Sequence, residues 1–226
     1  MRRIALSFLV VAITSLCVMS QERFVKPVDE ASQDASFLEF RSRLIAAAER
    51  KDLKYIQSIM DPKIELSFGG DVGLAGFRRV WKKPADFWPE FLAVLKNGGR
   101  FVGEGKNKMN SFSAPYLFVD MPEDLDVFEY YAVFGNNVNL RERPTADSPV
   151  VAQLSYNVLK IDEPAAVKRK TGTGKDDWAY DWHKIETLGG QKGWMKAEFV
   201  RSSIDLRAGF EKKRGRWVMT FFLAGD

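Results

Sequence analysis

The chain has little of the chemistry that most enzymes and metal proteins use. Among its 226 residues it has one cysteine, Cys17, and one histidine, His183. This count excludes zinc sites built from several Cys or His side chains, and it excludes Cys–His nucleophiles. No other motif indicates a cofactor or a bound metal, and we expect neither. Catalysis by a pair of carboxylates remains open, because two acidic residues leave no recognisable pattern.

The chain has only a small excess of positive over negative charge, and it has only one long apolar run. The net charge of +4 is too small to indicate nucleic-acid binding. The one long apolar run, residues 4–18, follows Arg2 and Arg3 and precedes Ser20, which is the pattern of a secretory signal peptide. Because this run is shorter than a membrane span, we predict that residues 1–20 are removed. An uncleaved membrane anchor is the alternative.

Export has two consequences for the remaining chain. Cleavage after Ser20 removes Cys17, so no disulfide can stabilise the protein and burial must do so. It also removes Arg2 and Arg3, which lowers the net charge to +2. We therefore expect a periplasmic or secreted protein with no stable membrane span.

The first part of the exported chain has the mixed patterns of an α+β domain. Residues 21–35 are polar and are predicted to form a flexible spacer. Apolar residues at helical spacing predict helices over 37–48, 53–60, 73–81 and 86–96, with Asp52 and Asp86 as N-caps. Alternation over 64–68, after Asp61-Pro62, predicts a half-buried strand. We assign residues 36–126 to this N-terminal α+β domain.

From Tyr131 onward the chain has short alternating runs separated by turn residues, which is an all-β pattern. The runs are VNLRERP at 138–144, SPVVAQL at 148–154, WHKIE at 182–186, GQKGWM at 190–195 and FV at 199–200. In this order they resemble the bacterial SH3 family, often called SH3b, over residues 131–201. The resemblance implies a small closed barrel that binds a cell-wall peptide or glycan, or an envelope protein. A long basic insertion between Leu159 and Trp182 departs from the family pattern.

Residues 204–226 are predicted to form a β-hairpin around Arg214-Gly215. Apolar residues occupy both sides of its last strand, with Phe221 on one face and Phe222 on the other, so we expect that strand to be buried on both faces. We predict that the hairpin packs on the N-terminal domain. The fold is then α+β, with an SH3-like barrel inserted in or appended to one domain. The spacing from Phe210 to Trp217 also faintly resembles NTF2-like proteins.

Candidate binding residues come from the barrel and its inserted loop. The residues at 178, 180, 182 and 184 recur at every second position, so one continuous strand would present an aromatic stripe. The tryptophans could instead belong to the barrel core or a groove wall, and the basic loop could be solvated or contact acidic groups. The candidate ligand-binding set is Trp178, Tyr180, Trp182, Lys184, Trp194, Lys168 and Arg169.

No catalytic residue is assigned. His183 fits a satisfied barrel residue, and the acidic group Glu123, Asp124, Asp126 and Glu129 fits either an acidic linker or a carboxylate site. We therefore expect a non-enzymatic binding protein whose partner is a cell-wall peptide or glycan, or an envelope protein. The alternatives are a carboxylate-dependent envelope hydrolase and a purely structural envelope protein.

Overall fold

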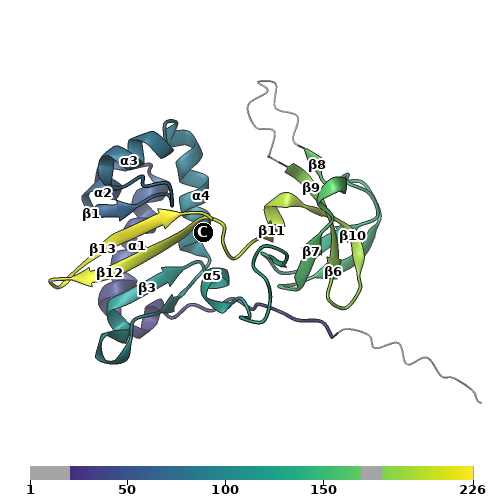
Figure 1. The fold of residues 1–226 in the computed structure, drawn as a ribbon, viewed down its shortest axis with the longest axis horizontal. Helices are drawn as coiled ribbons and strands as arrows, with labels where there is room; N and C mark the ends of the chain where they lie inside the picture. Colours follow the sequence, from purple (N-terminus) through teal and green to yellow (C-terminus); the bar gives the residue numbers. More distant parts are fainter. Residues whose placement is uncertain (1–20, 169–179, 226) are drawn as a thin grey trace, which may run out of the picture.

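The structure, a computed structural model, describes residues 21–168 and 180–225. The chain forms two lobes that lie side by side (Figure 1). We call them the N-terminal lobe, residues 35–120 with 207–223, and the barrel, residues 131–201. The helices are α1 (Ala35–Glu49), α2 (Leu53–Ser58), α3 (Gly73–Val80), α4 (Pro84–Lys96) and α5 (Tyr116–Asp120). No helix among the described residues has the length and apolar character needed to cross a bilayer.

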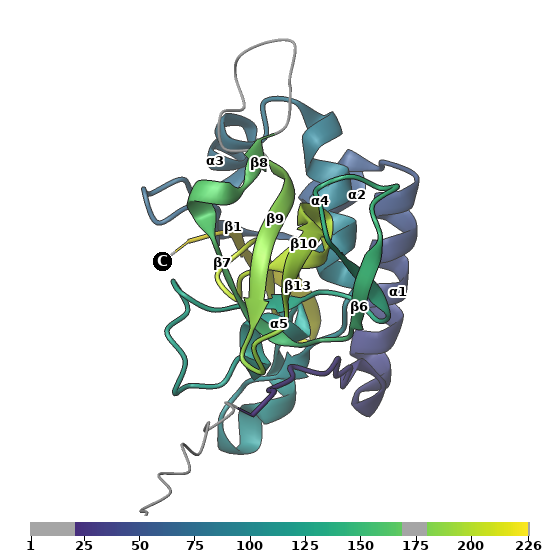
Figure 2. The ribbon, with the colours of Figure 1, turned by 90° about the vertical axis from the view of Figure 1, so that its right-hand side faces the viewer.

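The N-terminal lobe is built on a five-stranded sheet with the order β1-β13-β12-β3-β2. Its strands are β1 (Met60–Glu65), β2 (Arg100–Phe101), β3 (Ser111–Ala114), β12 (Arg207–Lys213) and β13 (Arg216–Leu223). The C-terminal hairpin β12–β13 lies in the middle, since β13 pairs in parallel with β1 and β12 pairs antiparallel with β3. Figure 2 shows α1 and α4 on one side of this sheet. The α+β class and its completion by the C-terminal hairpin are confirmed.

Aromatic rings fill the space between the helices and the sheet. The ring of Phe37, on α1, is fully buried, and its centroid lies 4.2 Å from that of Phe112 and 4.8 Å from that of Trp217. Phe222, on β13, packs edge-on against Phe91 of α4 with a centroid distance of 5.2 Å. Such rings bury large apolar areas and add favourable edge-to-face contacts. Burial therefore holds this lobe together without any disulfide.

The helix starts follow local capping rules, with one correction. Asp52 caps α2, because its side chain accepts from the backbone N–H of Tyr55 at 3.0 Å. Asp86 was expected to cap the helix over 86–96, but α4 begins earlier, after Lys83, and Asp86 lies in its first turn. Pro84 explains the difference, because proline at the first helical position loses no helix hydrogen bond and has the φ that a helix needs.

The C-terminal hairpin has a tight turn and an unexpected bulge. Arg214 and Gly215 both have positive φ, 51° and 78°, as a two-residue turn between twisted strands requires. Further along, the pairing shifts register next to Gly209, and the ring of Phe221 occupies the space where a Gly209 side chain would lie. Because the bulge adds one residue, Phe222 faces the helices together with Trp217 and Met219, rather than the face opposite to them.

The barrel has strand order β11-β4-β7-β9-β10-β5-β6, with β8 paired to β9. Its strands are β4 (Tyr131–Val133), β5 (Val138–Arg141), β6 (Val150–Leu154), β7 (Val158–Ile161), β8 (Val167–Lys168), β9 (Tyr180–Thr187), β10 (Lys192–Lys196) and β11 (Val200–Arg201). Mostly aliphatic side chains fill it, namely Val133, Val138, Leu140, Leu154, Leu159, Ile185 and Met195. The run that begins at Val138 alternates as expected, with Val138 and Leu140 buried and Asn139 and Arg141 partly exposed.

Residues 21–35 were expected to be a flexible spacer, but Ala35 already begins α1, and the preceding residues, 21–34, contact both lobes. We call them the N-terminal strap. On the barrel, the backbone N–H of Val25 donates to the carbonyl of Tyr156 at 2.8 Å. The carboxylate of Glu22 accepts from the hydroxyl of Thr187 at 2.5 Å. The polar side chains that indicated a spacer are therefore hydrogen-bond partners of residues far along the chain, which a local composition pattern does not reveal.

The strap then continues onto the N-terminal lobe. The backbone N–H of Gly99 donates to the carbonyl of Val28 at 2.9 Å, and Arg100 forms an ion pair with Glu30 at 2.8 Å. Between the two lobes lies a separate apolar cluster, which contains Val25, Tyr116, Leu117, Met121, Ala132 and Val158. The strap, α5 and the barrel thus share one buried joint.

Candidate functional site

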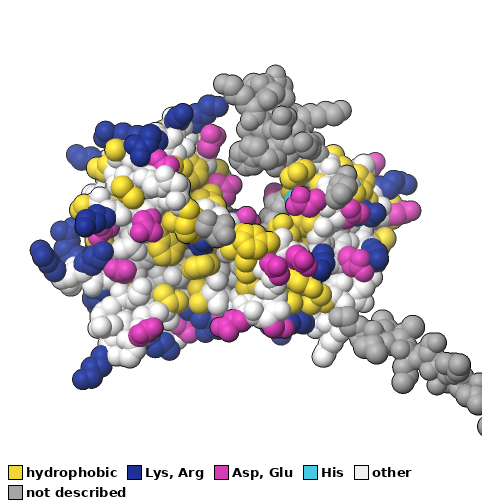
Figure 3. Space-filling view, in the orientation of Figure 1, with side chains coloured by type: hydrophobic (Ala, Val, Ile, Leu, Met, Phe, Trp, Pro, Cys, Tyr) yellow, Lys and Arg dark blue, Asp and Glu magenta, His cyan; other side chains and the backbone are white. Residues whose placement is uncertain are grey.

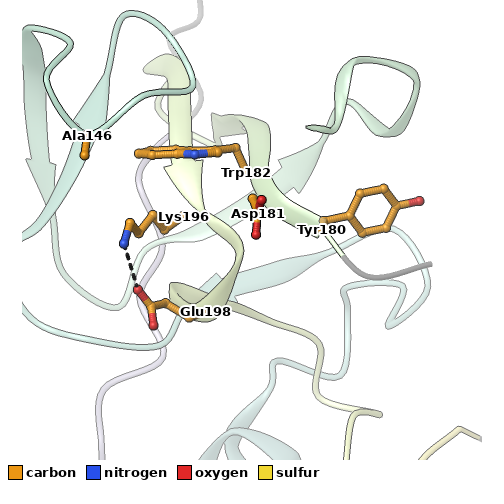
Figure 4. A pocket seen from close by; sticks show the side chains of 6 residues that line it. All are labelled: Ala146, Tyr180, Asp181, Trp182, Lys196 and Glu198. Carbon is orange, nitrogen blue, oxygen red and sulfur yellow. Dashed lines mark ion pairs between the residues drawn. The ribbon is translucent and has the colours of Figure 1, made fainter. Parts of the chain in front are cut away.

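A groove on the barrel is the candidate binding site. It consists of two adjoining hollows of about 330 and 380 Å³, which share Ala146, Trp182, Lys196 and Glu198 (Figure 4). We call it the Trp182 groove. Strands β5, β9 and β10, the turns before β5 and after β10, and the segment between β5 and β6 supply its lining. Residues as far apart in the chain as Asn136 and Phe199 therefore meet there only because the barrel closes.

Trp182 forms a wall of this groove. It lies on β9 directly opposite Lys196 of β10, on the face away from Ile185, which points into the barrel core. Trp182 is 8% exposed, so most of its ring is already covered by protein. Figure 4 shows the flat indole with Ala146 to one side and the side chain of Lys196 below it. The residue therefore shapes the groove and offers a limited apolar surface. It is a groove-wall residue, one of the alternatives left open by the sequence, and it still exposes part of its ring to a ligand.

The second hollow is lined by polar side chains that neighbouring residues hold in place. Asn139 accepts from the side-chain amide of Gln153 at 3.0 Å, and the guanidinium of Arg141 donates to the carbonyl of Ser148 at 2.6 Å. Such contacts fix the direction of the remaining donors and acceptors before a ligand arrives, which lowers the entropy cost of binding. Besides Lys196 and Glu198, which the two hollows share, the polar lining consists of Asn136, Asn137, Asn139 and Arg141.

Charges of both signs stand at the groove. Lys196 and Glu198 form an exposed ion pair with a nitrogen–oxygen distance of 3.5 Å, drawn as the dashed line in Figure 4. An exposed pair of this length contributes little to stability, so exchange for a charged ligand group is not costly. Asp181 adds another carboxylate to the first hollow. The groove can therefore meet a ligand that carries both amino and carboxyl groups.

The aromatic stripe expected at every second residue is only partly present. Trp182 and Lys184 share a face of β9, and Trp194 lies opposite Lys184 on β10, but neither Lys184 nor Trp194 lines the groove. Tyr180 lines the first hollow but points away from the indole of Trp182 (Figure 4), and its ring lies 5.1 Å from that of His183.

The remaining predicted residues come from the inserted loop and from the strand that follows it. Trp178 and Arg169 lie outside the described residues, and for Lys168 only the backbone is described, as part of β8. Lys184 forms an ion pair with Asp162 at 3.4 Å. Of the predicted residues whose side chains the structure describes, Trp182 and Tyr180 line the groove and Lys184 and Trp194 do not, while Trp178, Lys168 and Arg169 stay predictions.

Other candidate groups do not converge on a second site. In the acidic group, Asp124 pairs with Arg23 at 2.6 Å, and Glu129 pairs with Lys160 at 2.7 Å, so two of its carboxylates point to different cations. No cluster of three or more His, Cys, Asp or Glu side chains suited to a metal ion occurs in the described parts of the chain. Burial lowers the pKa of His183, which disfavours its charged form.

Sequence reasoning missed several lining residues, because they lie in turns rather than in periodic runs. Ala146 and Glu198 fall into this class, whereas Lys196 ends β10, and none of the three follows an alternating pattern that points to the groove. A signal existed for Asn139 and Arg141, which alternate with the inward residues of β5 and so must face outward. Only the pairing of β10 with β9 and β5 shows which outward residues meet.

A small barrel with a groove beside one tryptophan defines the class of module present here. Residues 136–201 match the family model described as the bacterial SH3 domain, which confirms the resemblance predicted from the sequence. Bacterial SH3 domains are general cell-wall-binding modules. No curated protein and no solved structure matches the chain. The faint NTF2-like resemblance of the N-terminal lobe thus has no support from these comparisons.

Proposed function

We propose that this protein is an exported, non-enzymatic binding protein of the cell envelope, and that the Trp182 groove binds its ligand. The ligand is a cell-wall peptide or glycan, or an envelope protein. The observation that carries the proposal is the groove itself, which lies within the residues that match the bacterial SH3 family. The leader-like residues 1–20 support a periplasmic or secreted location.

The lining chemistry fits such a ligand. Trp182 supplies an apolar wall, Asn139 supplies an amide, and Arg141, Lys196 and Glu198 supply charges of both signs. Wall fragments carry hydroxyls, amides and free amino and carboxyl groups, which these side chains can hydrogen-bond or pair with. A few fixed polar groups beside an apolar wall are the usual composition of a specific binding site.

The test is sedimentation of the chain that begins at Gln21 with insoluble peptidoglycan. Glu198→Lys changes the groove charge, and Glu186→Lys is its matched control. Both glutamates are exposed, lie on the barrel and pair with a lysine, but Glu186 does not line the groove. We expect several-fold weaker retention for Glu198→Lys and unchanged retention for Glu186→Lys.

Trp182→Ala tests the apolar wall, with circular dichroism and thermal melting as checks on folding. A folded Trp182→Ala protein with reduced retention supports the groove. Wild-type protein that is not retained would overturn a wall ligand and leave an envelope protein partner or a structural role. Soluble fragments released in the same tubes would instead show a hydrolase, contrary to the proposal.

A further inference from the structure

The surface around α3, far from the barrel, combines exposed apolar and basic side chains. Phe68 is 59% exposed, Val72 is 50% exposed and Leu74 is 42% exposed. Such side chains are unusual on a protein surface when several lie close together, and they mark interaction sites. Figure 3 shows basic side chains gathered over this upper part of the N-terminal lobe, with apolar ones among them. We call the set the α3 surface: Phe68, Val72, Leu74, Arg78, Lys82 and Lys83.

The geometry of α3 separates a buried face from this surface. Gly76 and Phe77 are buried against the lobe, whereas Leu74 and Arg78, one helical turn apart, lie on the exposed face. A helix with apolar and basic side chains on its solvent side is the arrangement found in helices that lie on membrane surfaces.

The segment before α3 is held in place, so its apolar residues project at fixed positions. The backbone N–H of Leu66 donates to the carbonyl of Asp71 at 2.9 Å, and an isolated bridge joins Glu65 to Val72. These contacts close a short loop with Phe68 near its tip. The loop does not need to order on contact with a partner, which lowers the entropy cost of association.

The charges of the α3 surface are not neutralised within the lobe. Asp71 pairs with Arg79 at 2.7 Å, so that acidic group is already satisfied. Arg78, Lys82 and Lys83 are exposed, and none of them has an ion-pair partner among the described residues. The three cations and the three exposed apolar side chains belong to one stretch of chain, residues 68–83, and together they match a surface that is anionic and has an accessible apolar layer beneath.

We propose that the α3 surface binds the anionic surface of a lipid bilayer. The cations attract acidic headgroups, and Phe68, Val72 and Leu74 enter the boundary between headgroups and acyl chains. A soluble polyanion could use the cations but gives the apolar side chains no partner. The contact is peripheral, since it needs no membrane-spanning segment. It is independent of the proposed function, because no residue of the α3 surface lines the Trp182 groove.

The first test is co-sedimentation of the chain that begins at Gln21 with vesicles of phosphatidylglycerol and phosphatidylcholine, and with phosphatidylcholine alone. Each basic residue near an anionic membrane contributes enough that Arg78→Glu with Lys82→Glu is expected to weaken binding at least about tenfold. The matched control is Lys106→Glu with Lys108→Glu, an equal charge change at exposed residues in the 3-10 turn Gly105–Asn110, which the ribbon places at the other end of the lobe (Figure 1).

The second test reports insertion directly. The chain from Gln21 has no cysteine, so Leu74→Cys accepts one environment-sensitive dye, and Val151→Cys on the barrel is the control. We expect the Leu74→Cys dye emission to shift to the blue with anionic vesicles, and not with polyglutamate at equal charge. Equal binding to neutral vesicles, equal loss in both charge pairs, or an unshifted dye would each overturn the proposal. Groove binding to peptidoglycan is measured separately, so the failure of one proposal does not imply failure of the other.

Discussion

The N-terminal lobe and the barrel use aromatic side chains in different ways. The lobe encloses most of its rings, so that Phe37 and Phe222 have no contact with solvent, and Phe68 is an exception. The barrel fills its interior with mostly aliphatic side chains, and Trp182 lies outside that cluster, where it shapes a groove. The comparison teaches that the same residue type fills the core of one region and forms the wall of a surface groove in the other. Pattern reasoning at the level of residue type cannot separate these two roles.

The largest effect is expected from an aromatic residue of the lobe. Phe37→Ala removes a ring that contacts Phe112 and Trp217, and it leaves a cavity between α1 and the sheet. We expect it to lower the free energy of unfolding by about 3–5 kcal/mol. Urea denaturation measures this, with the neighbouring Leu38→Ala, on the exposed side of α1, as the control. Equal effects of the two changes would contradict an aromatic core on this face.

The joint between the two regions is the next point to test. Val25 is buried in the apolar cluster between the lobes, and Val25→Ala removes two methyl-sized groups from it. We expect a loss of about 2 kcal/mol from apolar area and cavity together. Phe24→Ala, at an exposed neighbour in the strap, is the control.

The same variant shows whether the strap couples the two regions. Calorimetry of Val25→Ala is expected to separate one unfolding transition into two, because the barrel and the lobe lose a shared contact. A single transition, lowered as a whole, would mean that the remaining joint residues couple the regions without the strap.

The features predicted from the sequence are those that local rules determine. The Asp52 cap depends on neighbours within three residues, and the inward alternation of β5 depends on one strand alone. The bulge beside Gly209 depends instead on the ring of Phe221 across the hairpin. The prediction of a flexible spacer was wrong for the same reason. Glu22 accepts a hydrogen bond from Thr187, a residue that reaches it only after the whole barrel has folded.

The residues of the candidate site likewise divide into those that the sequence predicts and those that it does not. Trp182 could be selected from the sequence, because it lies in a run that resembles the bacterial SH3 family, where a tryptophan belongs to the core, to a groove wall or to a ligand-binding surface. Glu198 could not, because it follows the last residues of β10 and reaches the groove through the pairing of β10 with β9. Tyr180 was predicted to belong to one aromatic stripe with Trp182, but its ring points away from the indole and lies against that of His183.

The smallest expected effect is a difference between the barrel and the N-terminal lobe in the pH at which each loses stability in acid. Burial lowers the pKa of His183 in the barrel, and its Nδ1 is buried without a hydrogen-bond partner among the described residues. In the lobe, the hydrogen bond from Lys213 lowers the pKa of the Asp61 carboxyl. Both groups bind protons more readily when the chain is unfolded, so each contributes stability that is lost as the pH falls. For His183 the loss begins below about pH 6.5, and for Asp61 below about pH 4.

The barrel should therefore weaken in milder acid than the N-terminal lobe. Urea titrations followed by two-dimensional amide NMR spectra, repeated at several pH values, give the unfolding midpoint of each region separately. His183→Gln is expected to flatten the response of the barrel between neutral pH and about pH 5, and Asp61→Asn to flatten that of the lobe only at lower pH. If His183→Gln leaves the barrel as acid-sensitive as the wild type, the burial of a neutral histidine is not the cause, and the two regions do not differ in the way the structure indicates.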